Sequence, residues 1–408
     1  MSTVYSERLS PDTTLDLAAV VRVAAAHADQ VDLEGRFPVE AIAALRASGL
    51  LGCMLPHDLG GRGASLLDIA RQCQQIARGC ASTAMIYAMH QSQVACIVGH
   101  ALTQPWHRAL ARRIAEEGLL LGSVTSEVGV GGDMGSSRCA MVVADGRFTL
   151  EKHAPTVSYG AYADVLLVTC RAHADAPPSD QALVTLLRSD CDLTPTGGWD
   201  ALGMRGTCSG AFRLSATGRA DQIVPAAFAE ISENSMVPVS HLLWGAAWTG
   251  IAAEAVTRAR AFLRAQARRQ IGTMPPGAVR LVHAVASLDT IQAALSRALT
   301  QFDVAHPLGR ARFARDAAID GAAGAWPTGM ARASLLNALK IEISTQCHDV
   351  VMEALRICGM SGYKNGGEFS VGRHLRDILS AQIMISNDRI ATTTGALLLA
   401  QRHDLGTL

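Results

Sequence analysis

The amino-acid sequence predicts an α+β protein with three consecutive parts. These are an N-terminal helical domain (residues 1–118), a central antiparallel β-barrel or sandwich (119–230) and a C-terminal four-helix bundle (231–408). Apolar residues recur at helical spacing up to about Gly118, short runs rich in Val, Leu and Thr follow, and helical spacing returns after Pro238. At 408 residues the chain is also long enough for two to three domains.

The N-terminal helices have recognisable boundaries. Pro11 suits the first turn of a helix, and residues 15–31 continue with helical spacing. Pro38 opens a second helix, which Gly49 ends as a residue suited to a left-handed backbone. After a glycine-rich turn, two long segments with helical periodicity extend to about residue 118.

The period of the apolar residues then changes. Six short runs with turn residues between them predict β-strands: 119–126, 139–144, 147–152, 164–170, 182–188 and 210–216. Four long segments after Pro238 predict the helices of a bundle: 241–269, 278–304, 330–357 and 374–402.

Composition excludes several classes of protein. Lys plus Arg equals Asp plus Glu at 36 each, so no net charge attracts nucleic acid or an anionic membrane. The first residues lack the pattern of a signal peptide, and no apolar run reaches the ~18 residues of a membrane helix. The ten cysteines form no CxxC pair and lie in apolar segments, as reduced buried thiols do. We expect a cytoplasmic protein without a metal site, and the charged fraction of 18% favours an oligomer.

The stretch LLLGSVTSEVGVGGDMG, residues 119–135, is the candidate ligand loop. Its glycines allow close approach of a ligand to the backbone, and the hydroxyls of Ser123, Thr125 and Ser126 offer hydrogen bonds. A dinucleotide fingerprint would need glycine where Met134 stands and should open a helix, so it fits poorly. An ordinary β-turn between two strands is the alternative interpretation.

Several motifs, in order along the chain, resemble the acyl-CoA dehydrogenase superfamily. SEVGVGGDM aligns without gaps on that family's TEPGAGSDV-like loop, GWDALGMRGTCSG on its GMRGT stretch, and ARRQIG on its ERKTFG. The family's N-terminal helix and the turn that follows it resemble FPVEAIAALRASGLLGCMLPHDLGGRG here. Its GG-GY…RD segment resembles ALRICGMSGYKNGGEFSVGRHLRD. The resemblance covers nearly the whole chain.

The resemblance implies FAD as the cofactor. Thr125 and Ser126 would contact the edge of the isoalloxazine ring, and Gly131 and Gly132 would lie near the pyrophosphate. Thr156 matches the threonine of the family's EK-WITNG strand, and the tryptophan of that strand is replaced here by Ala154. Hydrogen-bond donors beside the flavin ring stabilise the charge of its reduced form.

In that family, a neighbouring subunit holds part of the ADP moiety, so a homotetramer or homodimer is implied. Arg268 would grip the pyrophosphate, with Ile271 beside it, and Arg356 and Gly359 would lie near the adenosine. Asn387 replaces a threonine that contacts the flavin. For Arg268 the alternative is a solvated helix face, because other arginines surround it.

The residues that would identify the reaction differ from the family pattern. Abstraction of a substrate α-proton needs a carboxylate, which the family supplies at one of two positions, here Ile385 and Ser240. Asp388 is a candidate displaced base or a capping acid, and His90 a candidate pocket residue or a satisfied core histidine. Glu127 matches a structural residue, and the catalytic residues stay unknown. His241 stands where an arginine usually follows the second glutamate position, which weakens the case for ordinary substrate handling.

Three hypotheses therefore remain. The first is an FAD-dependent dehydrogenase that oxidises an acyl thioester or related substrate at its α,β carbons, with electron-transfer flavoprotein as acceptor. The second is a monooxygenase that uses oxygen and reduced flavin from a flavin reductase, although Ala381 and Met384 stand where comparable members often carry histidines. The third is a non-catalytic binding or assembly protein of the same fold. The substrate, and whether it is a CoA thioester, stay open.

Overall fold

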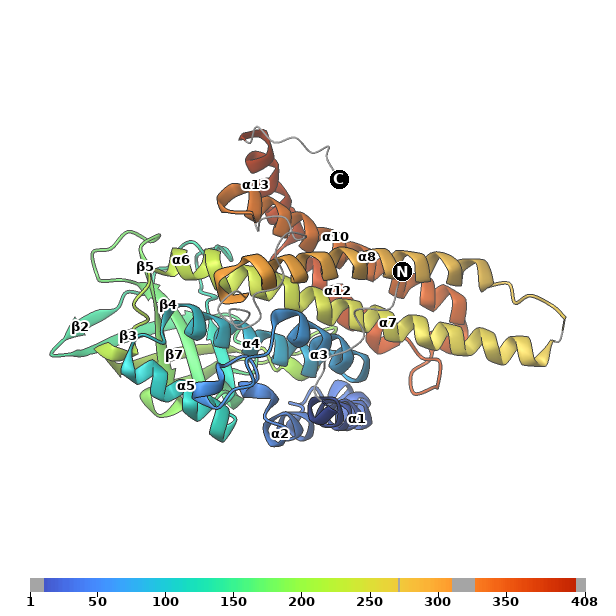
Figure 1. Ribbon diagram of the computed structural model, residues 1–408, viewed down its shortest axis with the longest axis horizontal. Helices are drawn as coiled ribbons and strands as arrows, with labels where there is room; N and C mark the ends of the chain where they lie inside the picture. Colours follow the sequence, from blue (N-terminus) through green and yellow to red (C-terminus); the bar gives the residue numbers. More distant parts are fainter. Residues whose placement is uncertain (1–10, 271, 310–326, 401–408) are drawn as a thin grey trace.

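The computed structural model describes residues 11–270, 272–309 and 327–400 of the chain. Helices form its N-terminal part (Figure 1): α1 (Pro11–Glu34), α2 (Val39–Ala47), α3 (Leu66–Gly79), α4 (Ala81–His100) and α5 (Pro105–Glu117). Helix α4 is buried along most of its length, because apolar and small residues occupy every face. It packs against α3, against the long helix of the C-terminal bundle and against the first strand, so it joins the helical and β parts.

Two small sheets form the central part. The strands are β1 (Leu121–Val124), β2 (Val142–Ala144), β3 (Arg147–Ala154), β4 (Val165–Arg171), β5 (Gln181–Leu187), β6 (Cys191–Gly197) and β7 (Ala211–Arg219). The sheet orders are β1-β4-β5 and β2-β3-β7-β6.

The expectation of a wholly antiparallel β part is wrong at one pairing. Strands β1 and β4 are parallel, with Leu121 opposite Val165, whereas all the other strand pairs are antiparallel. The chain leaves β1 and forms β2 and β3 of the other sheet before it returns as β4. Parallel neighbours need such a long crossover, which a pattern of hairpin-like turns does not reveal.

Strand β6 has no counterpart among the expected strands. It contains Pro195, which argues against a strand when the sequence is considered alone. Because β6 is at the edge of its sheet, next to β7 only, the missing N–H of proline removes no bond to a further strand.

The C-terminal part is a bundle of α7 (Val237–Arg269), α8 (Ala278–Ala305), α10 (Gly329–Cys358) and α12 (Gly372–Ile383), preceded by α6 (Phe228–Ile231) and a π-helical turn (Ser232–Met236). Figure 1 shows α7, α8 and α10 running side by side away from the sheets. Small residues allow close crossings: a Cβ at Gly250 of α7 would lie 2.3 Å from the Gln74 carbonyl oxygen of α3. The α+β class with a C-terminal four-helix bundle is confirmed.

The last expected helix, 374–402, is in fact two. Helix α12 ends at Ile383 and α13 (Asn387–Ala400) begins after a bend, and α13 projects from the body of the molecule (Figure 1). Ile385 in the bend has φ +51°, which is an unfavourable left-handed conformation for a β-branched residue. Apolar periodicity continues through the bend, so the sequence pattern alone does not show it. A short α11 (Met360–Tyr363) lies between α10 and α12.

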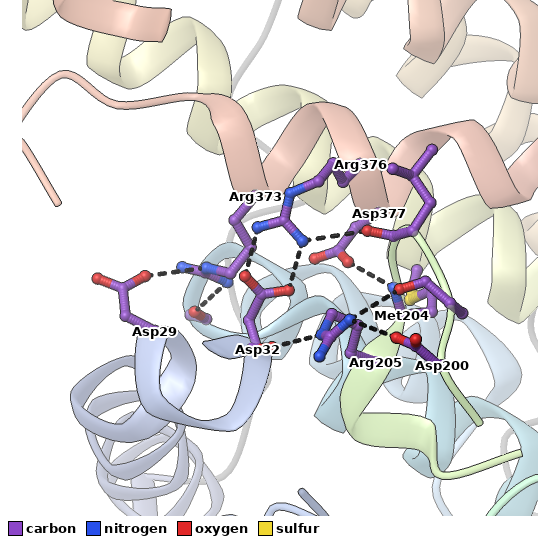
Figure 2. A network of polar contacts seen from close by, with 11 residues as sticks. Asp29, Asp32, Asp200, Met204, Arg205, Arg373, Arg376 and Asp377 are labelled. Atoms are coloured by element: carbon purple, nitrogen blue, oxygen red, sulfur yellow. Dashed lines mark hydrogen bonds and ion pairs between the residues drawn. The ribbon is translucent and has the colours of Figure 1, made fainter. Parts of the chain in front are cut away.

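A polar network joins the three parts of the chain (Figure 2). Arg376 of α12 donates two hydrogen bonds to the carboxylate of Asp32 on α1 and one to the carbonyl of Leu202. The buried carboxylate of Asp377 accepts a bond of 2.6 Å from the backbone N–H of Met204. Residues from the N-terminal helices, the β part and the bundle thereby meet at one place.

All ten cysteines are free thiols, eight of them buried, as the sequence predicts. In the part of the chain that the structure describes, no helix is long and apolar enough to cross a membrane. The boundaries 1–118, 119–230 and 231–408 stay our proposed division into domains.

Stability should fall steeply in mild acid. Five buried histidines have a pKa below the usual value, chiefly because burial disfavours the charged ring: His90, His107, His241, His306 and His374. The pKa is about 4 for His90, His107 and His306 and about 3 for His241. Below pH 6.5 the unfolded chain therefore binds more protons than the folded one, and each histidine removes about 1.4 kcal/mol of stability per pH unit.

Asp377 has the opposite effect on stability in acid, because burial raises its pKa to about 6 and the folded protein therefore binds this proton before the unfolded chain does. Between pH 6 and pH 5 these six groups together make the unfolded chain bind about four more protons than the folded one. The free energy of unfolding therefore falls by about 5 kcal/mol per pH unit. Denaturant unfolding measured from pH 7 to pH 5 should show this loss. The exposed His153→Gln variant should keep the same slope, and an unchanged midpoint over this range would contradict the prediction.

Candidate functional site

The glycine-rich loop after β1 is fixed to the sheets by a buried carboxylate. Glu127 accepts hydrogen bonds from Ser137 Oγ (2.7 Å), the N–H of Arg138 (3.0 Å) and the N–H of Cys139 (2.7 Å). Its other neighbour is the ammonium of Lys152, 3.6 Å away and fully buried. Burial lowers the pKa of Lys152, an effect that Glu127 partly offsets. The loop therefore has a fixed starting point, and the structural role expected for Glu127 agrees with these contacts.

An inner cavity of about 150 Å³ lies next to this loop. Helix α4, the loop, the turn after β3, the start of α7 and the bend before α13 all contribute to it. Its lining residues are Met89, Ser92, Gln93, Ser123, Thr125, Met134, Thr156, Ser158, Tyr159, Met236, Val237, Ser240, Trp244 and Ile385.

The structure brings together the residues predicted for the flavin ring. Thr125 and Thr156 both line the inner cavity, and Ser126 Oγ donates to the Thr156 carbonyl at 2.6 Å. Gly131 and Gly132 are exposed further along the loop. Gly131 has φ +60°, and an added Cβ there would meet nothing within 4 Å, so the space in front of its backbone is open.

The two positions that would carry a catalytic carboxylate meet in the inner cavity. Ser240 lines it from α7 and Ile385 lines it from the bend before α13. Among the described residues that line this cavity, none carries a carboxylate. Its polar groups are hydroxyls, one amide and one indole N–H.

Three buried polar side chains at or beside this cavity have hydrogen-bonding atoms without partners. The Oε1 of Gln93 and the Nε1 of Trp244 are both unpaired, and both residues line the cavity. Both ring nitrogens of His241, the residue after Ser240, are also unpaired. An unpaired buried polar atom costs about 1–3 kcal/mol, so a ligand that supplies the missing partners would bind favourably.

Lys340 is a residue of this region that no sequence motif marks. This buried lysine of α10 donates to the carbonyl of Ile385 (2.8 Å) and to Oδ1 of Asn387 (2.6 Å), and its ammonium lies 5.7 Å from the Trp248 ring centre. Burial lowers its pKa to about 8. Lys340 thus stabilises the bend that carries Ile385.

Asn387, which was predicted to contact the flavin, is turned toward α10. Its side-chain oxygen accepts from Lys340, and its Nδ2 donates to Ser344 Oγ at 3.0 Å. Its amide therefore supports the bend in this structure.

Two other candidates do not line the inner cavity. His90 is fully buried and bonded on both ring nitrogens, to the carbonyl of Leu51 and the N–H of Leu121. Asp388 lies exposed in the first turn of α13 and does not line the inner cavity. Its neighbour Arg389 reaches the loop and donates to the carbonyl of Gly131.

The residues predicted to hold the ADP part of FAD lie elsewhere. Arg268 is exposed in the last turn of α7, and 28 residues of helix separate it from Ser240, a length of about 40 Å. Arg356 and Gly359, both exposed, stand where α10 ends, and Arg356 pairs with Glu353. Ile271 lies outside the described residues. Within one chain, Arg268, Arg356 and Gly359 therefore do not reach the inner cavity.

A larger outer cavity of about 660 Å³ adjoins the inner one, since Met134 and Val237 line both. It also contains Arg332, which is buried and donates to Glu233 at 2.6 Å. The Oε1 of Gln181 is buried there without a partner. This space would accommodate a substrate much larger than the inner cavity alone.

Residues 17–104 match the family model of the acyl-CoA dehydrogenase N-terminal domain. The amino sugar nitrososynthase DnmZ of Streptomyces peucetius is 27% identical over 362 residues, which are 86% of this chain and 84% of that protein. A dibenzothiophene monooxygenase of Rhodococcus qingshengii is 27% identical over 235 residues, which are 55% of each chain.

Solved structures share the fold over almost the entire chain. FMN-bound TdsC from Paenibacillus sp. A11-2, a dibenzothiophene monooxygenase, has a TM-score of 0.80 at 18% identity and covers 98% of this chain and 99% of its own. Butyryl-CoA dehydrogenase of Megasphaera elsdenii has a TM-score of 0.79 at 18% identity, covering 97% and 100%.

Removing the charge that faces Glu127 should loosen the loop. Lys152→Met leaves the buried carboxylate without its cation, and we expect a loss of about 3 kcal/mol in the free energy of unfolding. Combining it with Glu127→Gln should recover part of that loss. Denaturant unfolding measures both, with the exposed Lys364→Met as the control, and a Lys152→Met protein as stable as this control would refute the role of the pair.

Proposed function

We propose that this member of the acyl-CoA dehydrogenase superfamily is a flavin-dependent monooxygenase that oxidises a nitrogen or sulfur atom of a small polar substrate. The observation that carries the proposal is the lining of the inner cavity. It has Ser240 and Ile385 where a proton-abstracting carboxylate would stand, and unpaired polar atoms on Gln93 and Trp244.

These groups suit a substrate that both donates and accepts hydrogen bonds. The Trp244 N–H would donate to a heteroatom, and the Gln93 carbonyl would accept from an amine or a hydroxyl group. An acyl chain in the same place would leave both atoms unpaired and would meet no base.

The loop fits a flavin. Thr125 and Thr156 line the inner cavity, and the open backbone at Gly131 leaves room for a phosphate group. When bound, a reduced flavin would supply the two electrons with which oxygen is activated, one oxygen atom entering the substrate and the other leaving as water. The chain's own side chains orient the substrate, and the packed walls of α4 and α7 exclude water.

If the cofactor is FAD, its ADP part would lie among Arg268, Ile271, Arg356 and Gly359. These would come from a second copy of the chain, because α7 separates Arg268 from Ser240 at the inner cavity by about 40 Å. FMN requires only the residues near the loop, and TdsC was solved with FMN. The proposal thus has two forms: a homodimer or homotetramer that binds FAD, or a single chain that binds FMN. A flavin reductase would be the electron-supplying partner.

Support comes from the relatives, since a nitrososynthase and a dibenzothiophene monooxygenase are both similar to this chain. Oxidation of an acyl thioester, with electron-transfer flavoprotein as acceptor, is the second candidate. The shared fold with butyryl-CoA dehydrogenase favours it. So does the outer cavity of about 660 Å³, which could hold the long part of a substrate that does not react. It would need a base from outside the lining described above.

A direct test compares the two reactions. The purified protein should bind FMN or FAD and, with a flavin reductase, NADH and oxygen, should convert an amine or a sulfide from a panel that includes nucleotide-linked amino sugars. Under nitrogen, acyl-CoA thioesters should leave the bound oxidised flavin unbleached. Bleaching by a thioester would instead establish the dehydrogenase, and failure to bind either flavin would refute both.

Loss of the unpaired groups should weaken substrate binding. Gln93→Leu and Trp244→Phe each remove one hydrogen bond to the substrate, worth about 1.4 kcal/mol, so KM should rise about tenfold. Flavin affinity, measured by fluorescence quenching, should stay unchanged. Met89→Leu, which changes an apolar wall of the same cavity, is the matched control, and equal KM values in all three variants would argue against the assigned roles.

A further inference from the structure

A separate cavity of about 330 Å³ lies between α1, the C-terminal half of α7, the loop at 365–370 and the start of α12. It shares no lining residue with the inner cavity or the outer cavity. The residues proposed to contact flavin or substrate do not line it. A ligand in this cavity would therefore be distinct from both.

His374 is the first indication of a ligand there. It lines the cavity, its side chain is almost fully buried, and neither ring nitrogen has a partner. Burial, together with Arg373 and Arg258, lowers the pKa of His374 well below its usual range, so the ring is neutral. A neutral ring offers one N–H donor and one acceptor, and both lack partners at this place.

The start of α12 is the second indication. The helix spans 12 residues, and no side chain caps its first turn. The first N–H groups of a helix lack partners within the helix and attract anions. The residue at this start is Gly372, where a Cβ would lie 2.9 Å from Asn365 Oδ1, so the first turn and the loop come close only because glycine stands there.

Guanidinium groups line the cavity, and each is already paired with one carboxylate, Arg258 with Glu254 among them. Three arginines and two aspartates line it. The aspartates are already bonded, Asp29 to Arg373 at 3.1 Å and Asp32 to Arg376. Arg258 donates to the Ser370 carbonyl through Nη1 and to Glu254 through Nε, which leaves its Nη2 for a ligand.

We propose that this cavity binds a small phosphorylated ligand. The phosphate is held at the start of α12 by the helix N–H groups together with Arg258 and Arg373, and the ring N–H of His374 donates to the ligand. The remaining volume holds a small organic group. Because α12 leads to the bend that carries Ile385, the ligand would also stabilise the helix that ends at the inner cavity.

Calorimetric titration of the full chain, with and without FMN, tests the proposal. Inorganic phosphate and glycerol 3-phosphate are the probes, with potassium chloride at the same ionic strength as the reference. We expect saturable binding of both, with glycerol 3-phosphate at least as tight as phosphate. Arg258→Gln should weaken binding at least tenfold and His374→Phe at least fivefold, whereas Arg264→Gln, exposed six residues further along α7, should not change it.

Histidine resonances give a second measurement that needs no variant at position 374. In protein labelled with ¹⁵N-histidine, saturating phosphate should shift one neutral imidazole pair, and the shift should be lost in Arg258→Gln. Titration curves equal to those of chloride would overturn the proposal. Binding that Arg258→Gln leaves intact would place the anion elsewhere and would overturn it as well. Neither outcome depends on the oxidation of any substrate, so the monooxygenase proposal is tested independently.

Discussion

The architecture depends on two contacts at the start of the bundle, of Arg376 with Asp32 and of Asp377 with Met204, and the first ties residues 344 positions apart in the chain (Figure 2). The contacts are possible because Gly203 has no side chain, since a Cβ there would lie 2.0 Å from the Arg376 carbonyl oxygen. The GMRGT and RD motifs that supported the family resemblance therefore meet each other. In this chain the two motifs join three parts of the fold, and their contacts say nothing about the reaction.

The sequence predicted the order of helices and strands, because long apolar periodicity reports directly on which face of a helix or strand is buried. It missed what depends on distant partners. The bend at Ile385 is stabilised by Lys340, 45 residues earlier, and β6 tolerates Pro195 only as an edge strand. The parallel pairing of β1 with β4 follows from a crossover between sheets, which no local pattern encodes.

The candidate site was predictable to a similar extent. Thr125 of the loop and Thr156 of the turn after β3 come together as expected from the motifs, and Ser240 and Ile385 meet in one cavity. The unpaired atoms of Gln93 and Trp244 and the inward turn of Asn387 were not predictable, since they depend on side-chain orientation. A buried lysine beside the cavity, with no carboxylate in the lining of the described chain, also gives the region an electrostatic character opposite to that of a proton-abstracting site.

The length of α7 has a consequence for how a dinucleotide cofactor could be loaded. A rigid helix of 33 residues keeps its two ends about 50 Å apart, so no motion within one chain closes them around a single FAD. Occupancy of such a cofactor would then follow mass action between subunits and fall on dilution, whereas a mononucleotide at the loop would be indifferent to protein concentration.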